Sequence, residues 1–277
     1  MEVIWKLVET CIIPIITYGG ETWDLNKGET QTANRILDSI LKRLLLVPTS
    51  TPREVLYHET GIMDIQHIIM KNRINMHHRL EVTKNELINE MLKMTTDKAW
   101  IKKTEEAERD MNMEYITYMS KKDAKKQVQE NIYNKFKETL HEQGANKSKV
   151  QFLIEGATGI NREGRPTYMQ KFTRYEASTI FKARTRMIDV KNNYRGKYQD
   201  LMCRICKEEN ETQIHVFEEC KALHKDTNTK VTREMIFSND VNILEQTVKK
   251  IDRIMTELKC VVHENVHPGY PGNHTTN

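Results

Sequence analysis

Three cysteines and one histidine lie close together in the sequence, at Cys203, Cys206, His215 and Cys220, with the spacing C-x2-C-x8-H-x4-C. Zinc prefers four tetrahedral thiolate and imidazole ligands, and a C-x2-C turn directs two sulfur atoms to one point. Four protein ligands leave no open position on the metal, so the spacing predicts a structural zinc ion and not a catalytic one. His224 is an alternative to His215 as the fourth ligand.

The alternative interpretation of these cysteines is that they are reduced and packed as small apolar side chains beside a surface histidine. Their neighbours at residues 207–210, Lys-Glu-Glu-Asn, are poor core residues, and this favours the metal site. The other two cysteines, Cys11 and Cys260, stand alone and are expected to be core or incidental residues. Five cysteines in a long, Lys-rich chain do not resemble a disulfide framework, so we expect reduced thiols in a soluble, intracellular protein, either nuclear or cytoplasmic.

A basic stretch precedes the cysteine cluster. Between Lys171 and Lys207 the sequence has ten basic residues and three acidic ones, whereas the whole chain has a net charge of only +4. Cations can bind phosphates, and interleaved tyrosine rings offer stacking surfaces for unpaired bases, so we predict binding of single-stranded or structured RNA or DNA. The alternative is that the basic residues serve solubility alone. The candidate phosphate contacts are Lys182, Arg184, Arg186, Lys191, Arg195, Lys197 and Arg204, and the tyrosines are Tyr168, Tyr175, Tyr194 and Tyr198.

The elements that must position these residues are amphipathic helices, and the expected fold class is mainly α. Apolar residues recur at three- and four-residue spacing from Ala33 to Leu45, and Pro48 ends that helix. A second, short helix is expected to begin with Thr51 as its N-cap and to end at Gly61.

Two further signals concern the first and third helices. Asn26 and Glu29 have the spacing of a capping box at the start of the first helix. A third helix is expected to carry its apolar stripe from Ile65 to Met76 and Leu80. These helices predict a small bundle in the N-terminal part of the chain.

The rest of the chain is organised around a charged middle region. From about residue 85 to residue 143 it favours helix but has sparse apolar residues, so we expect a solvated connector or hairpin, with a specific binding helix as the alternative. A Gly-rich linker at residues 156–164 precedes the basic helix. The expected segments are a helical domain at 1–82, a charged helical connector at 83–150, a basic helical segment at 151–200, a zinc knuckle at 201–225, a C-terminal helix at 226–260 and a disordered tail at 261–277.

Several other features carry no predicted chemistry. The uninterrupted apolar run at residues 11–16 is far shorter than the roughly 20 residues of a membrane span, so no membrane contact is expected. The apolar face of residues 1–16 should aggregate or recruit a protein partner. The adjacent His77 and His78 point to different faces of a helix, which argues against a metal site there. No serine or cysteine has the context of a nucleophile elbow.

Two blocks of the sequence resemble the reverse transcriptases of non-LTR retrotransposons. The first resembles the region after the palm and contains TCIIPIITYGGETWDL, an amphipathic helix, LLLVPTSTPREVLYHETGIMDI and KNRINMHHRL. In that family a Tyr-Gly-x-Glu-x-Trp signature opens the helical thumb, and the matching residues are Tyr18, Gly19, Glu21 and Trp23. The second block is similar to the C-terminal zinc-knuckle region of the same elements and reads FKARTRMIDVKNNYRGKYQDLMCRICKEENETQIHVFEEC. Together the blocks cover most of residues 1–225.

The resemblance implies a thumb-like helical bundle, in which the four signature residues are structural, followed by a knuckle that binds zinc and helps to bind nucleic acid. Polymerisation in the family requires palm aspartates that bind two metal ions, and this sequence contains no Asp-Asp pair. We therefore expect a zinc- and nucleic-acid-binding fragment without polymerase activity, lacking fingers and palm. The rival interpretations are the C-terminal part of a longer, active RNA-directed DNA polymerase, and a non-functional remnant or protein-interaction fragment.

Overall fold

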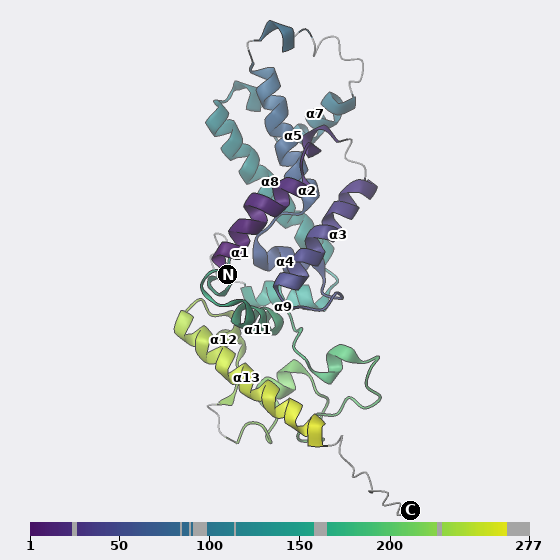
Figure 1. Ribbon diagram of the computed structural model, residues 1–277, viewed down its shortest axis with the longest axis vertical. Helices are drawn as coiled ribbons and strands as arrows, with labels where there is room; N and C mark the ends of the chain where they lie inside the picture. The colour runs from purple at the N-terminus through teal and green to yellow at the C-terminus, as the bar shows by residue number, and fades with distance from the viewer. Residues whose placement is uncertain are drawn as a thin grey trace, which may run out of the picture. The chain divides into compact units, whose positions relative to one another are not determined.

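The computed structural model describes residues 1–23, 27–83, 85–88, 90, 99–113, 115–157, 165–225 and 229–264. The protein is mainly helical, as expected, and these residues form no strand; a single antiparallel bridge joins Met202 to Asn210. The chain divides into two compact units (Figure 1). Unit 1 comprises Met1–Leu44 and Pro48–Lys147, and unit 2 comprises Leu45–Val47 and Ser148–Asn277.

Some sequence predictions lie outside the described residues. They include Asn26 of the expected capping box, most of the Gly-rich linker and the end of the expected tail. Where that tail was expected to start, at residue 261, the last helix in fact continues to Glu264. No helix in the described part of the chain combines the length and apolar character that crossing a membrane requires.

Unit 1 is built from helices that include the three expected ones. The regular elements are α1 (Glu2–Leu7), α2 (Ile13–Ile16), α3 (Lys27–Leu44), α4 (Arg53–Thr60), α5 (Ile65–Glu81), α7 (Ala99–Asp110) and α8 (Lys121–Gly144). A π-helical stretch, η1 (Val8–Ile12), joins α1 to α2, and short 3-10 turns lie at η2 (Gly20–Thr22) and η3 (Ile116–Tyr118).

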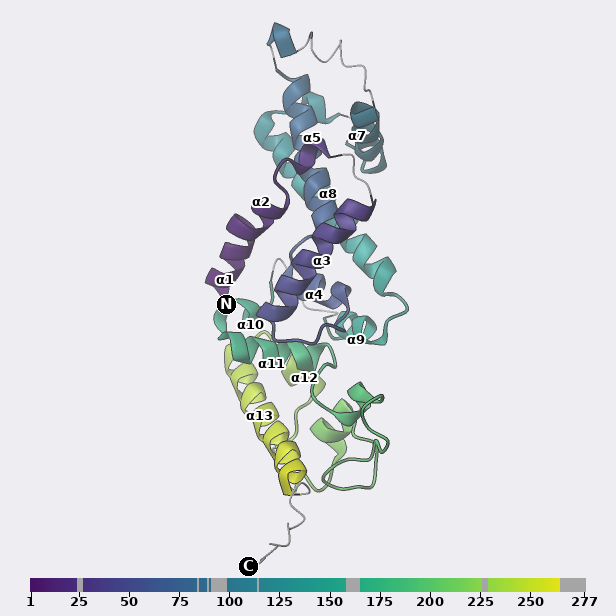
Figure 2. The ribbon, with the colours of Figure 1, turned by 45° about the vertical axis from the view of Figure 1, so that its right-hand side comes forward.

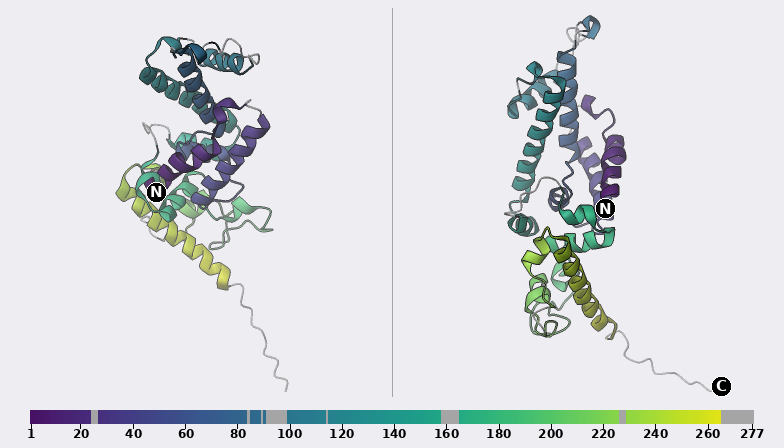
Figure 3. Two further views of the ribbon diagram at one scale, coloured as in Figure 1. Left: turned by 45° about the horizontal axis from the view of Figure 1, so that its top comes forward. Right: turned by 90° about the vertical axis from the view of Figure 1, so that its left-hand side faces the viewer.

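The charged middle region is packed into unit 1 instead of forming a separate solvated connector. Helices α5 and α8 lie side by side along much of their length (Figure 3). The buried residues Val128, Ile132 and Phe136 recur every fourth position of α8, and the Phe136 ring lies edge-on to Tyr57 at 6.1 Å and to His67 at 5.3 Å. This stripe is one residue wide, so the charged residues around it dominate the sequence pattern.

Helices α4 and α5 differ in detail from their predicted patterns. Helix α4 begins after Pro52, so the N-cap is one residue later than predicted, while Gly61 closes the helix at φ 65° as expected. Helix α5 buries polar residues such as His77 and His78, whereas Met76 and Leu80 are only half-buried. The reason is that α3, α7 and α8 all contact α5, so more than one face of this helix is covered.

The signature at residues 18–23 forms a turn whose backbone is bound by other helices. Gly19 has φ 65°, and a Cβ atom on Gly20 would lie 2.9 Å from a side-chain carbon of Ile69, so both positions favour glycine. The fully buried Arg73 donates to the carbonyl of Trp23 at 3.1 Å. These contacts give the turn a structural role within unit 1.

Glu21 and Tyr18 of the signature play different parts in that turn. The carbonyl of Glu21 accepts a hydrogen bond from the Trp100 indole nitrogen at 2.8 Å. Tyr18 differs from the expectation, because its side chain is 87% exposed and does not pack in the described structure. The structural role of the signature therefore comes mainly from its glycines and its backbone carbonyls.

Unit 2 consists of helices around a small core and a segment of irregular structure that contains the cysteines (Figure 2). Its elements are α9 (Ser148–Ala157), α10 (Thr167–Lys171), α11 (Arg174–Arg184), η4 (Lys191–Tyr194), η5 (His215–Glu219), α12 (Arg233–Phe237) and α13 (Val241–Glu264). Thr173 and Glu176 form a capping box at the start of α11. Helix α11 contacts α13, and buried apolar residues lie on both helices, Ile180 and Phe181 on α11 and Ile251 on α13.

Candidate metal centre and basic turn

The four residues predicted as metal ligands converge in unit 2. One ligand atom from each of Cys203, Cys206, His215 and Cys220 lies within 4.8 Å of all the others. The Sγ atoms of Cys203 and Cys220 are 4.0 Å apart, and the Cys206 Sγ is 3.3 Å from His215 Nε2. Tetrahedral zinc, with bonds of about 2.3 Å to sulfur and about 2.0 Å to nitrogen, places neighbouring ligand atoms roughly 3.5–3.8 Å apart. The donor set therefore fits a tetrahedral metal ion.

The two cysteines of the C-x2-C pair lie in a tight turn between the bridged residues Met202 and Asn210. The amide of Cys203 donates to the Glu209 carbonyl at 2.7 Å, and the amide of Lys207 donates to the Cys203 carbonyl at 3.0 Å. Lys207 adopts φ 58°, which turns the chain back after the second cysteine. The turn thus brings both thiols to the same side of the backbone.

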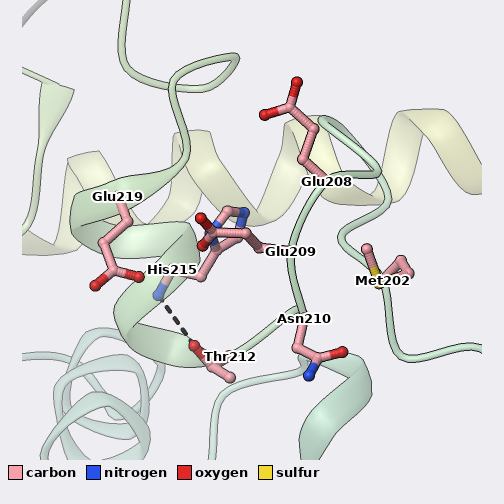
Figure 4. A pocket seen from close by; sticks show the side chains of 7 residues that line it. All are labelled: Met202, Glu208, Glu209, Asn210, Thr212, His215 and Glu219. Atoms are coloured by element: carbon pink, nitrogen blue, oxygen red, sulfur yellow. Dashed lines mark hydrogen bonds and ion pairs between the residues drawn. The ribbon is translucent and has the colours of Figure 1, made fainter.

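The other two ligands come from a helical turn, η5, and the residue after it. The amide of His215 donates to the Thr212 hydroxyl at 3.1 Å, and the amide of Cys220 donates to the His215 carbonyl at 2.8 Å (Figure 4). Val216 and Phe217 are buried and anchor this turn in unit 2. This local hydrogen bond between the backbones of Cys220 and His215 therefore holds the last two candidate ligands close together.

Glu209 fixes the proton on the histidine ring. Its carboxylate oxygen lies 3.0 Å from His215 Nδ1. Figure 4 shows the carboxylate in front of the imidazole ring. Both residues line a pocket of about 460 Å³. An ionised carboxylate only accepts hydrogen bonds, so Nδ1 carries the proton and Nε2 faces the cysteines with a lone pair. Carboxylates in this position orient many metal-binding histidines. In the sequence Glu209 is only one of several polar neighbours of the cysteines, so this contact could not be predicted from its local pattern.

The thiols differ in how easily they ionise. Burial opposes ionisation of Cys206, but backbone hydrogen bonds from residues 208–209 and the contact with His215 outweigh it and lower the pKa of this thiol to about 7. Burial raises the pKa of Cys203, and it raises the pKa of Cys220 to about 12. Because metals bind thiolates, a bound cation would supply the positive charge that these buried sulfur atoms need.

His224 does not belong to the cluster. Its Nε2 lies 3.0 Å from the carbonyl oxygen of Val216, and its Nδ1 lies 3.0 Å from the Thr229 hydroxyl. Both ring nitrogens thus bind other parts of unit 2, which corrects the suggestion that His224 could replace His215 as a ligand. Cys11 and Cys260 are exposed and also lie outside the cluster.

Two of the seven predicted phosphate contacts, Arg184 and Arg204, have little or no solvent exposure. Arg184 is fully buried, with its guanidinium 5.3 Å from the Tyr168 ring centre and 4.6 Å from that of Phe237. Arg204 forms an ion pair with Glu211 at 2.6 Å, and the two side chains are 9% and 0% exposed. A guanidinium in such a position does not reach a phosphate in solvent, so the prediction is wrong for both residues.

Three more of these residues are partly buried. Lys191 Nζ donates to the Asp200 carboxylate at 3.1 Å and to the Met202 carbonyl at 2.9 Å. The guanidinium of Arg186 lies 4.0 Å from the centre of the Phe152 ring. Lys182 is half-buried, and burial lowers the pKa of its ammonium group. Much of the basic composition therefore serves the internal structure of unit 2.

The remaining two basic residues, Arg195 and Lys197, are exposed on one turn. We call residues 194–198, Tyr-Arg-Gly-Lys-Tyr, the basic turn. The Lys197 ammonium lies 5.3 Å from the Tyr194 ring centre, and Tyr198 is 37% exposed. Cations and aromatic rings thus lie next to each other on this part of unit 2.

Glu211 connects the basic turn to the cysteine cluster. Its carboxylate accepts hydrogen bonds from the amide of Lys191 at 2.9 Å and from the amide of Arg204 at 3.0 Å. Its carbonyl accepts from the amide of Asn192 at 3.2 Å. The residue is fully buried, and its pKa is lowered because hydrogen bonds with Arg204 and these amides outweigh the effect of burial. Sequence reasoning missed Glu211, because nothing in the local pattern separates it from the exposed acids before it.

Comparison of the chain with protein-family models, with curated proteins and with solved structures found no match. The resemblance to retrotransposon reverse transcriptases therefore stays a prediction from the quoted sequence blocks.

Proposed function

We propose that this protein holds one structural zinc ion and uses the surface next to it to bind single-stranded or structured RNA or DNA. The observation that carries the proposal is the convergence of Cys203, Cys206, His215 and Cys220 within 4.8 Å. Four protein ligands complete the coordination of zinc, so the ion would stabilise the fold and would not contact a substrate.

Zinc would act on the basic turn through Glu211. The metal ties residues 203–206 to residues 215–220, and Glu211 ties the same segment to Lys191 and Asn192. Both links rigidify the chain on either side of the basic turn, so less conformational entropy is lost when a ligand binds there. The resident metal would thus support binding without taking part in it.

The basic turn has the chemistry that nucleic acid requires. Arg195 and Lys197 can neutralise phosphates, and the neighbouring rings of Tyr194 and Tyr198 can stack on unpaired bases. Asp200, the nearest acid after the turn, already binds Lys191. Of the seven predicted phosphate contacts, only Arg195 and Lys197 therefore remain in the proposed binding surface.

We also propose that the protein does not itself polymerise nucleotides. The sequence has no Asp-Asp pair of the kind that holds two catalytic metal ions, and the quoted blocks resemble regions outside the palm of the family. A longer chain that includes a palm would be an active RNA-directed DNA polymerase. An assay of nucleotide incorporation by this chain on a primed template tests the proposal, since measured activity would contradict it.

A second candidate function is binding of a protein partner through the N-terminal helices. Val3, Leu7 and Ile15 are 71%, 52% and 76% exposed, which is unusual for large apolar side chains that lie close together in sequence. Replacing all three by serine would weaken such an interaction and leave binding of nucleic acid unchanged.

A salt titration tests nucleic-acid binding. We expect the affinity for a fluorescent single-stranded RNA, and for the DNA of equal sequence, to fall steeply with salt because phosphate contacts release counterions. The double variant Arg195→Gln with Lys197→Gln should lower the slope of log affinity against log salt by about 1.4, or about 0.7 for each lost contact. The matched control is Lys249→Gln with Lys259→Gln, which removes the same charge from exposed positions of α13 and should keep the slope. Equal effects of the two pairs would exclude the basic turn as the contact.

A further inference from the structure

Unit 1 contains a pocket that is lined by three cations and one carboxylate among its described residues. The pocket has a volume of about 270 Å³ and lies between α5, the first turns of α8 and the turn η2. The lining residues are Glu21, Asn72, Asn75, His78, Arg79, Lys121 and Lys125. The sequence analysis passed over this region, because the cations come from two helices that are about 40 residues apart in sequence.

The helices present these side chains in register. Asn72, Asn75 and Arg79 follow each other at intervals of three and four residues on α5, and Lys121 and Lys125 are four residues apart on α8, so each set shares one helix face. The chain just before α8 is joined to α5 by a contact of 3.4 Å between the His78 ring and the carbonyl of Met119. The three cations therefore face a common space from two fixed helices. That space belongs wholly to unit 1.

The charges of the pocket are not balanced. Within the described part of the chain, Arg79, Lys121 and Lys125 form no ion pair, whereas the neighbouring Lys126 pairs with Glu130 at 3.8 Å. Glu21 supplies the one carboxylate among the described lining residues against three cations. Lys71 lies one turn from Asn75 on α5. Its burial and the charge of Lys125 lower the pKa of its ammonium group and outweigh the opposite effect of Glu9. Positive charge is thus concentrated on this face.

We propose that this pocket binds a phosphate group. A phosphate offers several anionic oxygens in tetrahedral directions, which suits one guanidinium and two ammonium groups that approach from separate helices. Asn72 adds an amide donor on the same face. The volume lies just below the usual range of about 300–1,000 Å³ for small-molecule sites, which favours one or two phosphate groups over a large ligand. The phosphate is either a free anion or part of a nucleic-acid backbone.

The test is a calorimetric titration of the full chain at low salt with inorganic pyrophosphate and, separately, with a single-stranded oligonucleotide. The variant Lys121→Gln with Lys125→Gln should weaken binding about tenfold or more. The control Lys122→Gln with Lys126→Gln removes two charges from the same turns of α8 outside the lining, and should change binding less than about twofold.

The outcomes separate the two sources of phosphate. If Lys121→Gln with Lys125→Gln loses binding of pyrophosphate only, the site binds a free anion. If it loses binding of the oligonucleotide only, the site binds a phosphodiester. Equal losses in both double variants, or no binding of either probe to the unmodified chain, would overturn the proposal. The result is independent of the basic turn, because Arg195 and Lys197 stay intact in both variants.

Discussion

Unit 1 and the cysteine-containing segment of unit 2 are stabilised by different kinds of interaction. In unit 1 the apolar stripe of α8 is buried against α4 and α5, with Phe136 only 1% exposed. Between residues 191 and 212 of unit 2, only two described side chains are buried, those of Cys203 and Glu211. A segment with so little apolar burial needs cross-links. The Arg204–Glu211 ion pair is one of them, and a metal ion held by the four converging side chains would be another.

The largest difference between the two units is expected from Phe136→Ala, which should destabilise unit 1 alone. Removing a ring that packs against Tyr57 and His67 should lower the free energy of unfolding of unit 1 by about 3–5 kcal/mol, while unit 2 keeps its metal. Hydrogen exchange of amides in each unit, together with metal analysis, measures both effects. Tyr118→Ala is the matched control, because this aromatic side chain is 91% exposed and its removal should change stability little. If Phe136→Ala lowered the stability of unit 2 as much as that of unit 1, the two units would not unfold independently.

A smaller effect is expected from Glu209→Gln. The amide still fits the space but no longer binds the His215 Nδ1 proton as strongly, so zinc affinity should fall about 10- to 100-fold. Competition with a fluorescent chelator gives the affinity. Glu208→Gln is the control, because this carboxylate lines the same pocket but points away from the His215 ring, as Figure 4 shows. Equal affinity of the two variants would exclude an orienting role for Glu209.

The smallest effect is a pH dependence of unit 1. Burial opposes protonation of His77, but its hydrogen bond with Glu108 at 2.9 Å and the nearby charges of Glu108, Glu81 and Glu105 outweigh burial, so the pKa of His77 is raised. The folded state therefore holds this proton more tightly than the unfolded state. The resulting stabilisation is complete below the unfolded pKa of about 6.5 and is lost as the pH rises through the folded value.

Denaturation followed between about pH 6 and pH 8 tests this expectation. The unmodified protein should lose stability in unit 1 as the pH rises, and Glu108→Gln should flatten that change because it removes the main partner of His77. An identical pH profile in the variant would contradict the assignment.

The convergence of the four candidate metal ligands could be predicted from the sequence because their geometry is local. Cys203 and Cys206 share one turn, and a backbone hydrogen bond connects Cys220 to His215. The capped helices of unit 1 were predicted for the same reason, since Gly61 and Pro48 mark their ends within the sequence itself. Local spacing is thus enough to predict a site or a helix whose residues are close together in the sequence.

The parts that could not be predicted depend on distant contacts. Arg184 is buried because the rings of Tyr168 and Phe237 cover it, and no local pattern reveals that pairing. Helix α8 buries only a narrow apolar stripe. The charged residues around this stripe dominate the sequence pattern, so the burial of the helix was not predicted. Arg79 of α5 and Lys121 and Lys125 of α8 line one pocket only because the two helices pack together.

The most direct test of the zinc centre is metal analysis of the purified protein together with Cys206→Ser and, as a control, Cys260→Ser. Cys260 is exposed and lies outside the ligand cluster, so its variant should bind zinc as the unmodified chain does. We predict one zinc ion per chain, its loss in Cys206→Ser, and faster amide exchange at residues 200–225 in that variant alone. Unchanged metal content in Cys206→Ser, or absence of zinc from the unmodified protein, would contradict a structural metal centre in unit 2.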